Sequence, residues 1–229
     1  MSAIPYSVRR SRRARRARIL VAADGVEVVV PDRFPLREVP SFVEQKRPWI
    51  ERTLGRMARS EAELPPARVE DGGQLPYLGE RLALRVRVVP ARRRAHVSRR
   101  GGTLAVALPQ PGIAPLRQAL ERWYRRRARE EIGMRLDAAT ARAGARHAGL
   151  QIRGQRSRWA SCSASGAMSF NWRLLLGPPE ILDYVVEHEV AHLEVHDHSE
   201  RFWALLALRC PQWRERERWL RAHGHALRI

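Results

Sequence analysis

The pattern His188-Glu189-Val190-Ala191-His192 constrains the fold and chemistry of this chain more than any other stretch. Residues four apart on a helix lie on one face, so His188 and His192 can direct imidazole nitrogens at one metal ion. Glu189 then lies close enough to take a proton from a metal-bound water. Zinc suits imidazole ligands and lowers the pKa of its bound water to about 7. The pattern therefore predicts a zinc site with Glu189 as general base.

A pattern of five residues with two free positions also occurs by chance, but the surrounding sequence argues against chance here. The preceding turn is strongly apolar and predicts a buried helix, in which two His and a Glu are unfavourable unless they have partners. Four of the eight histidines lie between His188 and His198. The apolar residues of that turn are Ile181, Leu182, Tyr184, Val185 and Val186.

A third protein ligand is expected from His196 or His198. If the helix continued, His196 would share its face but lie about 6 Å further along the axis, beyond reach of the metal. We therefore expect the helix to end near Val195 and the chain to double back, with Asp197 able to adopt a left-handed conformation. This interpretation favours His198 as the third ligand, with Ser199 capping the next helix.

The net charge of +19 is carried mainly by arginine and attracts polyanions. Nucleic acid or a nucleotide is therefore a candidate partner. Lys46 is the single lysine, so a genome-wide preference for arginine is the alternative explanation, and we favour it. The run from Arg9 to Arg18 holds seven arginines and no acid. It fits either a phosphate-binding arm or, as we prefer, a solvated edge strand.

The two cysteines, Cys162 and Cys210, form no Cys-x-x-Cys pair, which fits a reducing compartment. The N-terminus lacks the apolar core of a signal peptide. No run approaches the roughly 18 apolar residues of a membrane span. We expect a cytoplasmic protein with no membrane partner.

Residues 1–110 read as an N-terminal β-rich portion with one helix. Asp24-Gly25 predicts a hairpin between two apolar runs. Helical spacing covers Pro40–Arg59, where Pro48 would kink or restart the helix. Alternating residues between 77 and 108 predict a small antiparallel sheet.

Residues 111–229 read as the metal-binding catalytic core. A long helix is expected over Pro115–Ala143, followed by strands over 150–152 and 167–176. The metal helix should start at Pro178-Pro179, where the first turn requires no backbone donor. Two closing helices are expected over 199–209 and 211–222.

Several stretches together resemble the YgjP-like metallopeptidase family, which is related to the minigluzincin, SprT and WLM groups. They are Ser157–Ser163 (SRWASCS), Phe170–Leu174 (FNWRL), Tyr184–His192 (YVVEHEVAH) and His198-Ser199. The resemblance extends over nearly the whole chain and is most specific in the C-terminal third. Two departures are Ala160, where the family usually has glycine, and Val190, where it has leucine.

The resemblance implies an α+β fold with a zincin-like (minigluzincin) core and an N-terminal antiparallel β-rich portion. It implies one Zn²⁺ per chain, with His188, His192 and His198 as ligands. The strand Met168–Leu176 would lie over the cleft, and its edge would pair with an extended substrate. The substrate-lining residues would be Arg158, Trp159, Ser161, Cys162 and Asn171. Cys162 could also be read as a nucleophile, but we favour a structural or lining role.

The function that follows is zinc-dependent hydrolysis of a peptide or protein substrate. One alternative is a metal-dependent nucleoside triphosphate phosphohydrolase, in which arginines would hold the phosphates. Another is a peptidase that processes proteins associated with DNA, recruited by the basic surface.

Overall fold

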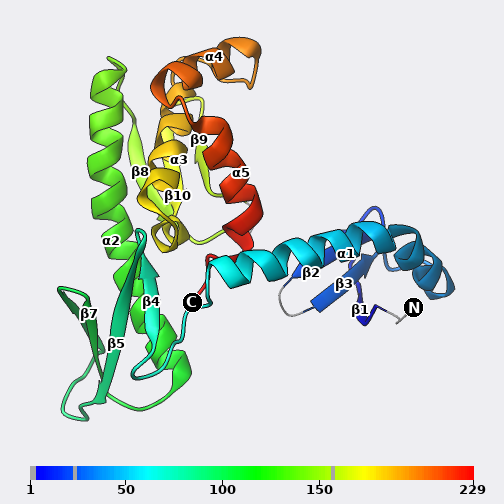
Figure 1. Ribbon diagram of the computed structural model, residues 1–229, viewed down its shortest axis with the longest axis horizontal. Coiled ribbons are helices and arrows are strands. Elements are labelled where there is room, and N and C mark those ends of the chain that lie inside the picture. Colours follow the sequence, from blue (N-terminus) through cyan, green and yellow to red (C-terminus); the bar gives the residue numbers. More distant parts are fainter. Residues whose placement is uncertain (1–3, 23–24, 156–157) are drawn as a thin grey trace. The chain divides into compact units, whose positions relative to one another are not determined.

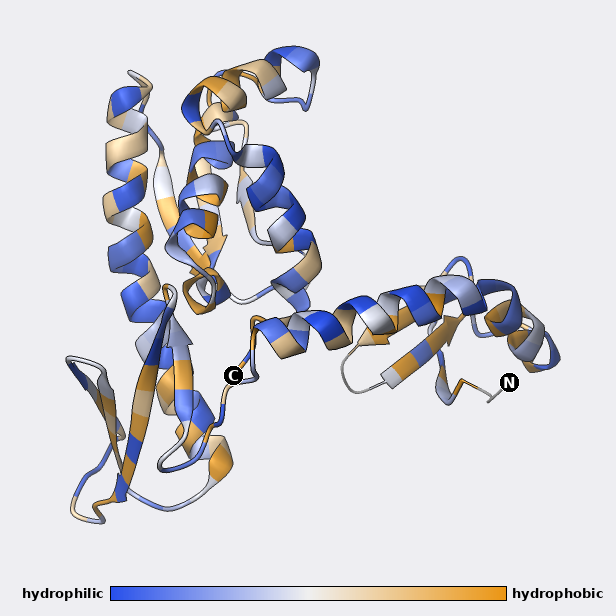
Figure 2. Cartoon of the chain, in the orientation of Figure 1, coloured by the Kyte–Doolittle hydropathy of each residue, from blue (hydrophilic) through white to orange (hydrophobic). Residues whose placement is uncertain are grey.

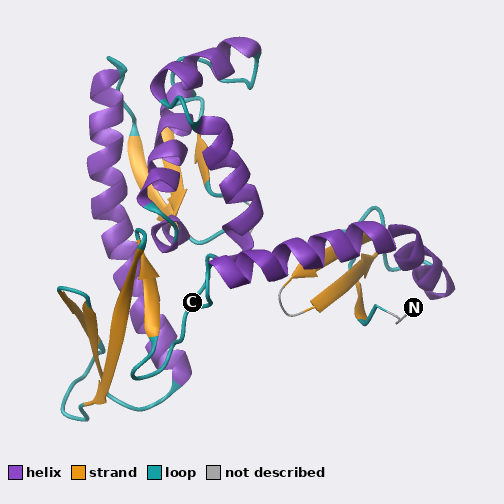
Figure 3. Cartoon of the chain, viewed as in Figure 1, coloured by secondary structure: helices purple, strands orange, loops and turns teal. Residues whose placement is uncertain are grey.

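The computed structural model describes residues 4–22, 25–155 and 158–229. Within these residues the chain has an α+β fold with three small sheets and five α-helices, as expected (Figure 1, Figure 3). Contacts divide it into one compact unit of Met1–Pro65 with Ala222–Ala226 and a second of Pro66–Arg221 with Leu227–Ile229. The expected division of function between residues 1–110 and 111–229 remains a prediction.

The first unit is built on strands β1 (Tyr6–Arg10), β2 (Arg18–Ala22) and β3 (Gly25–Val30), in the order β1-β3-β2. β2 and β3 pair antiparallel, as the hairpin signal predicted, although Asp24 itself lies outside the described residues. β1 pairs with β3 in parallel. The arginines of β1 and β2 thus lie on edge strands, where Arg9 bonds Glu27. The apolar core consists of Val26, Val28, Val30, Val39, Val43 and Ile50.

A short 3-10 turn, η1 (Leu36–Glu38), leads into helix α1 (Val39–Glu63) of the first unit. α1 runs as one helix through Pro48, so the expected restart does not occur. Another 3-10 turn, η3 (Gly224–Ala226), contacts α1.

A four-stranded sheet opens the second unit and has the order β4-β5-β7-β6. Its strands are β4 (Gln74–Tyr77), β5 (Glu80–Val88), β6 (His96–Arg100) and β7 (Thr103–Leu108). β6 and β7 form a hairpin through Gly101-Gly102, but β7 pairs with β5 in parallel. The expectation of a purely antiparallel portion is therefore wrong, because alternating apolar residues define the faces of a strand and not its direction.

Helix α2 (Ile113–Arg142) packs against β6 and β7 of this sheet and against strand β8 (Gly149–Arg153) (Figure 1). Its buried residues recur every three or four positions and form the apolar stripe of an amphipathic helix. Tyr124 is fully buried and its hydroxyl donates to the Pro76 carbonyl oxygen over 2.6 Å. The buried residues of α2 are Leu116, Ala119, Leu120, Trp123, Tyr124, Ala128, Ile132, Leu136, Ala139 and Thr140.

The third sheet has the order β8-β10-β9, with β9 at Ala160–Cys162 and β10 at Ala167–Asn171. The expected strand over 167–176 is too long, because Asn171 caps a 3-10 turn, η2 (Trp172–Leu176), by accepting from the Arg173 amide. β10 is also the central strand and not an edge, since β8 and β9 occupy its two sides. The edge strand beside the C-terminal helices is β9, which contacts α3.

Three helices follow: α3 (Pro179–Ala191), α4 (Glu200–Arg209) and α5 (Trp213–His223). α3 begins at the expected prolines and is buried around most of its circumference, whereas hydrophilic colouring dominates α5 (Figure 2). α3 packs against α2, α4, β9 and η2. Among the described residues, no helix combines the length and the apolar character needed to cross a membrane.

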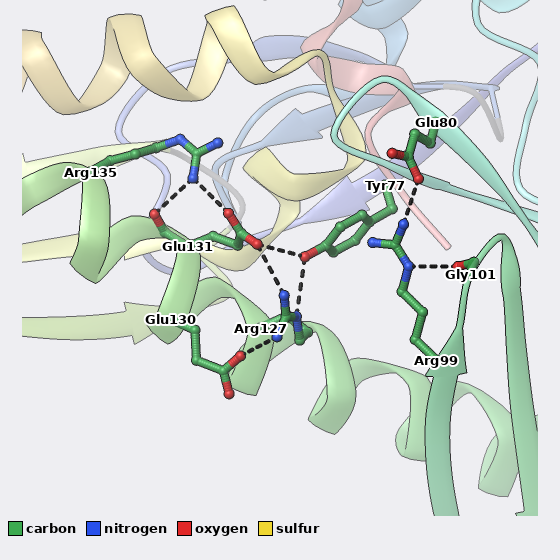
Figure 4. Close-up of polar contacts among 8 residues, drawn as sticks. All are labelled: Tyr77, Glu80, Arg99, Gly101, Arg127, Glu130, Glu131 and Arg135. Atoms are coloured by element: carbon green, nitrogen blue, oxygen red, sulfur yellow. Dashed lines mark hydrogen bonds and ion pairs between the residues drawn. The ribbon is translucent and has the colours of Figure 1, made fainter.

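A polar network joins the four-stranded sheet to α2 and α3 (Figure 4). The Glu131 carboxylate accepts from Arg135 at 2.6 Å, from Arg127 at 3.1 Å and from the Tyr77 hydroxyl at 3.1 Å. Arg135 also donates to the Asp183 carboxylate on α3 over 2.9 Å. Burial alone would raise the pKa of Glu131, but the bonds from Arg135 and Tyr77 outweigh it and lower this pKa. Glu131 is therefore the ionised centre of the network.

We expect Glu131→Gln to lower the free energy of unfolding at pH 7 by about 1–3 kcal/mol, because two arginines lose a charged acceptor. A carboxyl with a depressed folded-state pKa stabilises at neutral pH, and this contribution is lost as pH falls through that pKa. Urea unfolding should therefore show the difference from wild type shrinking as pH falls below the ordinary glutamate pKa of about 4.3.

Glu130→Gln is the matched control for this experiment. Glu130 is exposed and its carboxylate forms an ion pair with Arg127, and an exposed pair of this kind should contribute at most about 1 kcal/mol. Equal losses in the two variants would contradict a central role for Glu131.

Candidate metal centre

The C-terminal end of α3 carries the first two histidines. His188 lies in its last turn and His192 occupies the C-cap position, with ring centroids 5.0 Å apart. The helix ends at Ala191, four residues before the expected end at Val195. The amide of Val195 still bonds the Ala191 carbonyl oxygen over 3.0 Å, so the chain leaves α3 through a tight turn.

The segment after this turn places His198 close to His188 and His192. Asp197 does not adopt a left-handed conformation, because Leu78 is the only described non-glycine residue with positive φ. Instead, the Asp197 carboxylate accepts from the Ser199 amide over 3.1 Å. Ser199 is the N-cap residue of α4 as expected, but its own side chain makes no capping bond. The Asp197 carboxylate thus fixes the approach of the chain to α4.

His188, His192 and His198 come together at this point. Each offers one nitrogen, and these nitrogens all lie within 4.8 Å of one another. The Nε2 atoms of His188 and His198 are 3.1 Å apart. Among the residues that the structure describes, His196 does not belong to this group. The structure therefore brings together the three histidines that the sequence interpretation favoured.

The donor set and its spacing fit zinc. Two nitrogens at 2.0–2.1 Å from a tetrahedral zinc ion lie about 3.4 Å from each other, which is close to the 3.1 Å between the Nε2 atoms of His188 and His198. His192 uses Nδ1 to bond the Val195 carbonyl oxygen over 3.0 Å, which leaves Nε2 free to face the other two rings. The Nδ1 atom of His188 is buried and has no hydrogen-bond partner among the described residues.

Burial keeps the rings in the neutral form that metal binding needs. The pKa of His188 falls to about 3, mainly through burial and then through the charges that His192 and His198 would carry. Burial also lowers the pKa of His192, against the opposing effect of its bond to Val195. At neutral pH these two rings present lone pairs and not positive charge.

Aromatic side chains from α4 and α5 hold the histidines in place. Phe202 contacts all three rings at centroid distances of 4.5–4.9 Å and stacks on His192. Trp203 stacks on His198 at 5.5 Å, and Trp213 stacks on Trp203 at 4.5 Å. The sequence pattern did not predict that Phe202 and Trp203 contact the histidines. Their position one turn after His198 was the available signal.

Glu189 is buried, with 6% of its surface exposed, on the side of α3 that meets β9. Burial raises its pKa to about 7, while a hydrogen bond from the Cys162 backbone amide and the charge of Arg158 oppose this increase. The bond from Cys162 fixes the carboxylate against the edge strand. Nothing in the spacing of the sequence indicated this partner.

The other residues expected to line the site differ in what they contact. Arg158 is exposed and acts on Glu189 through its charge. The Ser161 hydroxyl lies 2.9 Å from that of Ser169 on the neighbouring strand. Burial raises the pKa of the Cys162 thiol, as does Glu189, so the thiol stays protonated at neutral pH and is a poor nucleophile.

Trp159 and Asn171 have structural contacts. Trp159 packs against the main apolar core, and its carbonyl oxygen accepts from the Asn171 amide over 2.7 Å. Asn171 is 2% exposed. Its side chain donates to the Gln155 carbonyl oxygen over 2.7 Å and accepts from the Arg173 amide. These bonds indicate that Asn171 shapes the segment before β9, whereas its role toward a substrate remains a prediction.

Comparison with known proteins gives a family and one similar structure. Residues 15–223 match the family described as YgjP-like, metallopeptidase domain. A solved structure, the metallopeptidase zymogen of Pyrococcus abyssi abylysin, shares 23% identity. The match covers 38% of this chain and 90% of that one, with a TM-score of 0.33. No curated protein matches. Because the family match spans nearly the whole sequence, this chain belongs to the YgjP-like metallopeptidase domain family.

Proposed function

We propose that this protein is a zinc-dependent peptidase with a zincin-like core, in which His188, His192 and His198 hold one zinc ion. Membership of a metallopeptidase family supports a metal-dependent hydrolase of peptides. The donors support zinc as the metal, since three imidazole ligands suit zinc better than they suit magnesium or calcium. Three protein ligands leave one position for water and substrate, as catalytic zinc requires.

The observation that carries this proposal is the position of Glu189. Its carboxylate is buried, follows His188 directly in the sequence of α3, and is tied to β9 through the Cys162 amide. A buried carboxylate without an arginine or lysine bonded to it is unfavourable unless it has a function. Its raised pKa, near 7, suits a group that must both accept and release a proton at neutral pH.

When bound, zinc would polarise the scissile carbonyl and make a water molecule easier to deprotonate. The chain's own contribution begins with Glu189, whose carboxylate takes the proton of the attacking water. The same carboxyl then delivers the proton to the nitrogen of the leaving amine. The bond from the Cys162 amide holds the carboxylate in one orientation for both transfers.

The edge of β9 is the proposed place for the substrate backbone. β9 pairs with β10 on one side, and its Cys162 amide points to Glu189. An extended peptide beside β9 would therefore pass the general base. This replaces the expected role of residues 168–176, whose strand is central in the sheet.

The alternative of a nucleoside triphosphate phosphohydrolase has less support from the site. Enzymes that act on nucleotides usually hold Mg²⁺ through carboxylates, and within the described residues no Asp or Glu joins the three histidines. Phosphate release that depends on His188 would favour this alternative. The other alternative, a peptidase that processes proteins associated with DNA, would use the same hydrolytic chemistry.

We place the protein in the cytoplasm because Cys162 and Cys210 are both free thiols.

We expect Glu189→Gln to keep about one zinc per chain and to lose peptide hydrolysis by a factor on the order of 10²–10⁴. The substitution preserves shape and removes the proton acceptor. Hydrolysis of a quenched fluorescent peptide library measures the loss, and elemental analysis measures the zinc.

Glu187→Gln provides the matched control, because Glu187 lies two residues away and bonds Arg142 on α2 over 2.6 Å. Its peptidase activity should stay within about threefold of wild type at a temperature where both are folded. Undiminished hydrolysis by the Glu189 variant would refute the mechanism.

We expect His198→Ala to reduce the zinc content well below one per chain and His196→Ala to leave it unchanged. The first substitution removes one of three converging nitrogens, whereas His196 is exposed and lies outside the group. Zinc affinity measured by competition with a chromogenic chelator gives the comparison. An equal zinc affinity in both variants would show that the ligands are assigned incorrectly.

A further inference from the structure

The outer face of the four-stranded sheet contains a groove of about 510 Å³ that has no part in the proposed chemistry. Buried and more exposed residues alternate over 82–85 of β5 and over 104–106 of β7. Leu84, Leu104 and Val106 are buried in the main core, whereas the residues between them point to the other face. This second face is not covered by α2, and we call it the outer face.

The pairing of the strands determines the shape of the groove. The central strand β7 supplies a floor of small side chains, Thr103, Ala105 and Ala107. Arg85 on β5 lies opposite Ala105 on one side. On the other side, Arg100 of β6 lies opposite Thr103. The two flanking strands are two strand spacings apart, or about 10 Å, so cationic side chains rise on both sides of a narrow floor.

The arginines of the outer face lack acidic partners. Arg85, Arg87 and Arg100 are exposed and make no ion pair with any described residue. Asp71 is the single acid that lines the groove, and its carboxylate accepts from the Val86 amide over 2.7 Å. The lining is therefore net positive. The turn between β5 and β6 adds three more exposed arginines, Arg92, Arg93 and Arg94.

On the opposite face of the same sheet, an arginine does form an ion pair with an acidic side chain. Arg99, next to Arg100, bonds Glu80 over 2.6 Å and lies over the Tyr77 ring (Figure 4). Arginines of α2 also have carboxylate partners, as Arg127 and Arg135 do. Within this sheet, Arg85, Arg87 and Arg100 on the outer face thus have no acidic partner, whereas Arg99 on the opposite face is paired.

We propose that this groove binds the phosphate backbone of single-stranded nucleic acid. Guanidinium groups match phosphate oxygens in two-bond geometry, and the hydroxyls of Ser98 and Thr103 supply further donors along the floor. The small floor residues let a sugar-phosphate chain approach the sheet closely. A single strand can lie between the two cationic sides and meet both.

The groove predicts binding that is independent of sequence. Among the described residues that line it there is no Trp, Tyr or Phe on which bases could stack. There is also no Asn or Gln for recognition of base edges. The contacts are therefore with phosphates, and the affinity should depend strongly on salt. This inference does not rest on the peptidase proposal.

The test uses the full-length chain and fluorescence anisotropy with a labelled oligothymidylate, between about 50 and 200 mM salt. The groove variant is Arg85→Gln/Arg87→Gln/Arg100→Gln. Its affinity should fall on the order of tenfold or more, and the slope of log K against log salt should decrease by about 2 for three lost phosphate contacts.

A control variant removes equal charge from the solvent face of α2: Arg117→Gln/Arg122→Gln/Arg126→Gln. These residues are exposed and have no ion pair in the described part of the chain. Its affinity and salt slope should stay near those of wild type. Thermal unfolding and zinc content of both variants would show that the fold is intact.

Four outcomes would overturn the proposal. Equal losses in the groove and control variants would mean that net charge alone attracts the oligonucleotide. Unchanged binding in the groove variant, or no binding by wild type at moderate salt, would remove the groove as a site. Equal displacement by a polyaspartate of the same charge would point to an acidic polypeptide instead.

Discussion

The burial of α3 is the constraint on which the rest of the second unit depends. This helix is packed on nearly every side, yet Glu187, His188 and Glu189 lie near its C-terminal end and His192 is its C-cap residue. Each polar side chain therefore needs a partner from another element. Glu187 has Arg142 of α2, Glu189 has the Cys162 amide of β9, and His188 has the ring of His198. The surrounding elements are positioned by these requirements as much as by apolar packing.

The aromatic contacts extend the same constraint to the C-terminal helices. The three histidine rings are not held by α3 alone, because Phe202 of α4 stacks on His192 and Trp203 of α4 stacks on His198. Trp213 of α5 in turn stacks on the Trp203 ring. An ordered third histidine therefore requires the packing of α4 and α5. The three-histidine group is a property of the assembled C-terminal part, although two of its histidines come from the C-terminal end of α3.

The sequence was sufficient for those parts of the site that depend on local spacing. The interval between His188 and His192, the apolar turn before them and the prolines at the start of α3 predicted a buried helix with two histidines on one face. The argument from axial rise also favoured His198 over His196, because it needs only helix geometry. The exact end of α3 was missed by four residues, since the turn depends on a bond between the His192 ring and the Val195 carbonyl.

Features that depend on pairing between distant segments could not be predicted. The partner of Glu189 is a backbone amide of β9. Every residue except proline has such an amide, so the residue type at position 162 did not indicate this partner. The position of β10 in the middle of its sheet also followed from tertiary contacts. Likewise, composition gave the excess of arginine but not its distribution. Only the folded structure shows that Arg99 is paired with Glu80, whereas the strand register places Arg85 and Arg100 on the open face.

The strand orders β1-β3-β2, β5-β7-β6 and β8-β10-β9 repeat one arrangement. In each, the strand made last lies in the middle, antiparallel to one earlier strand and parallel to the other. During synthesis, the earlier strands of each set therefore cannot take their places beside the middle strand until it has emerged from the ribosome. For the third sheet, that strand is β10, which directly precedes η2 and α3. The edge that holds Glu189 can thus form only when the chain is about to supply Glu189 itself.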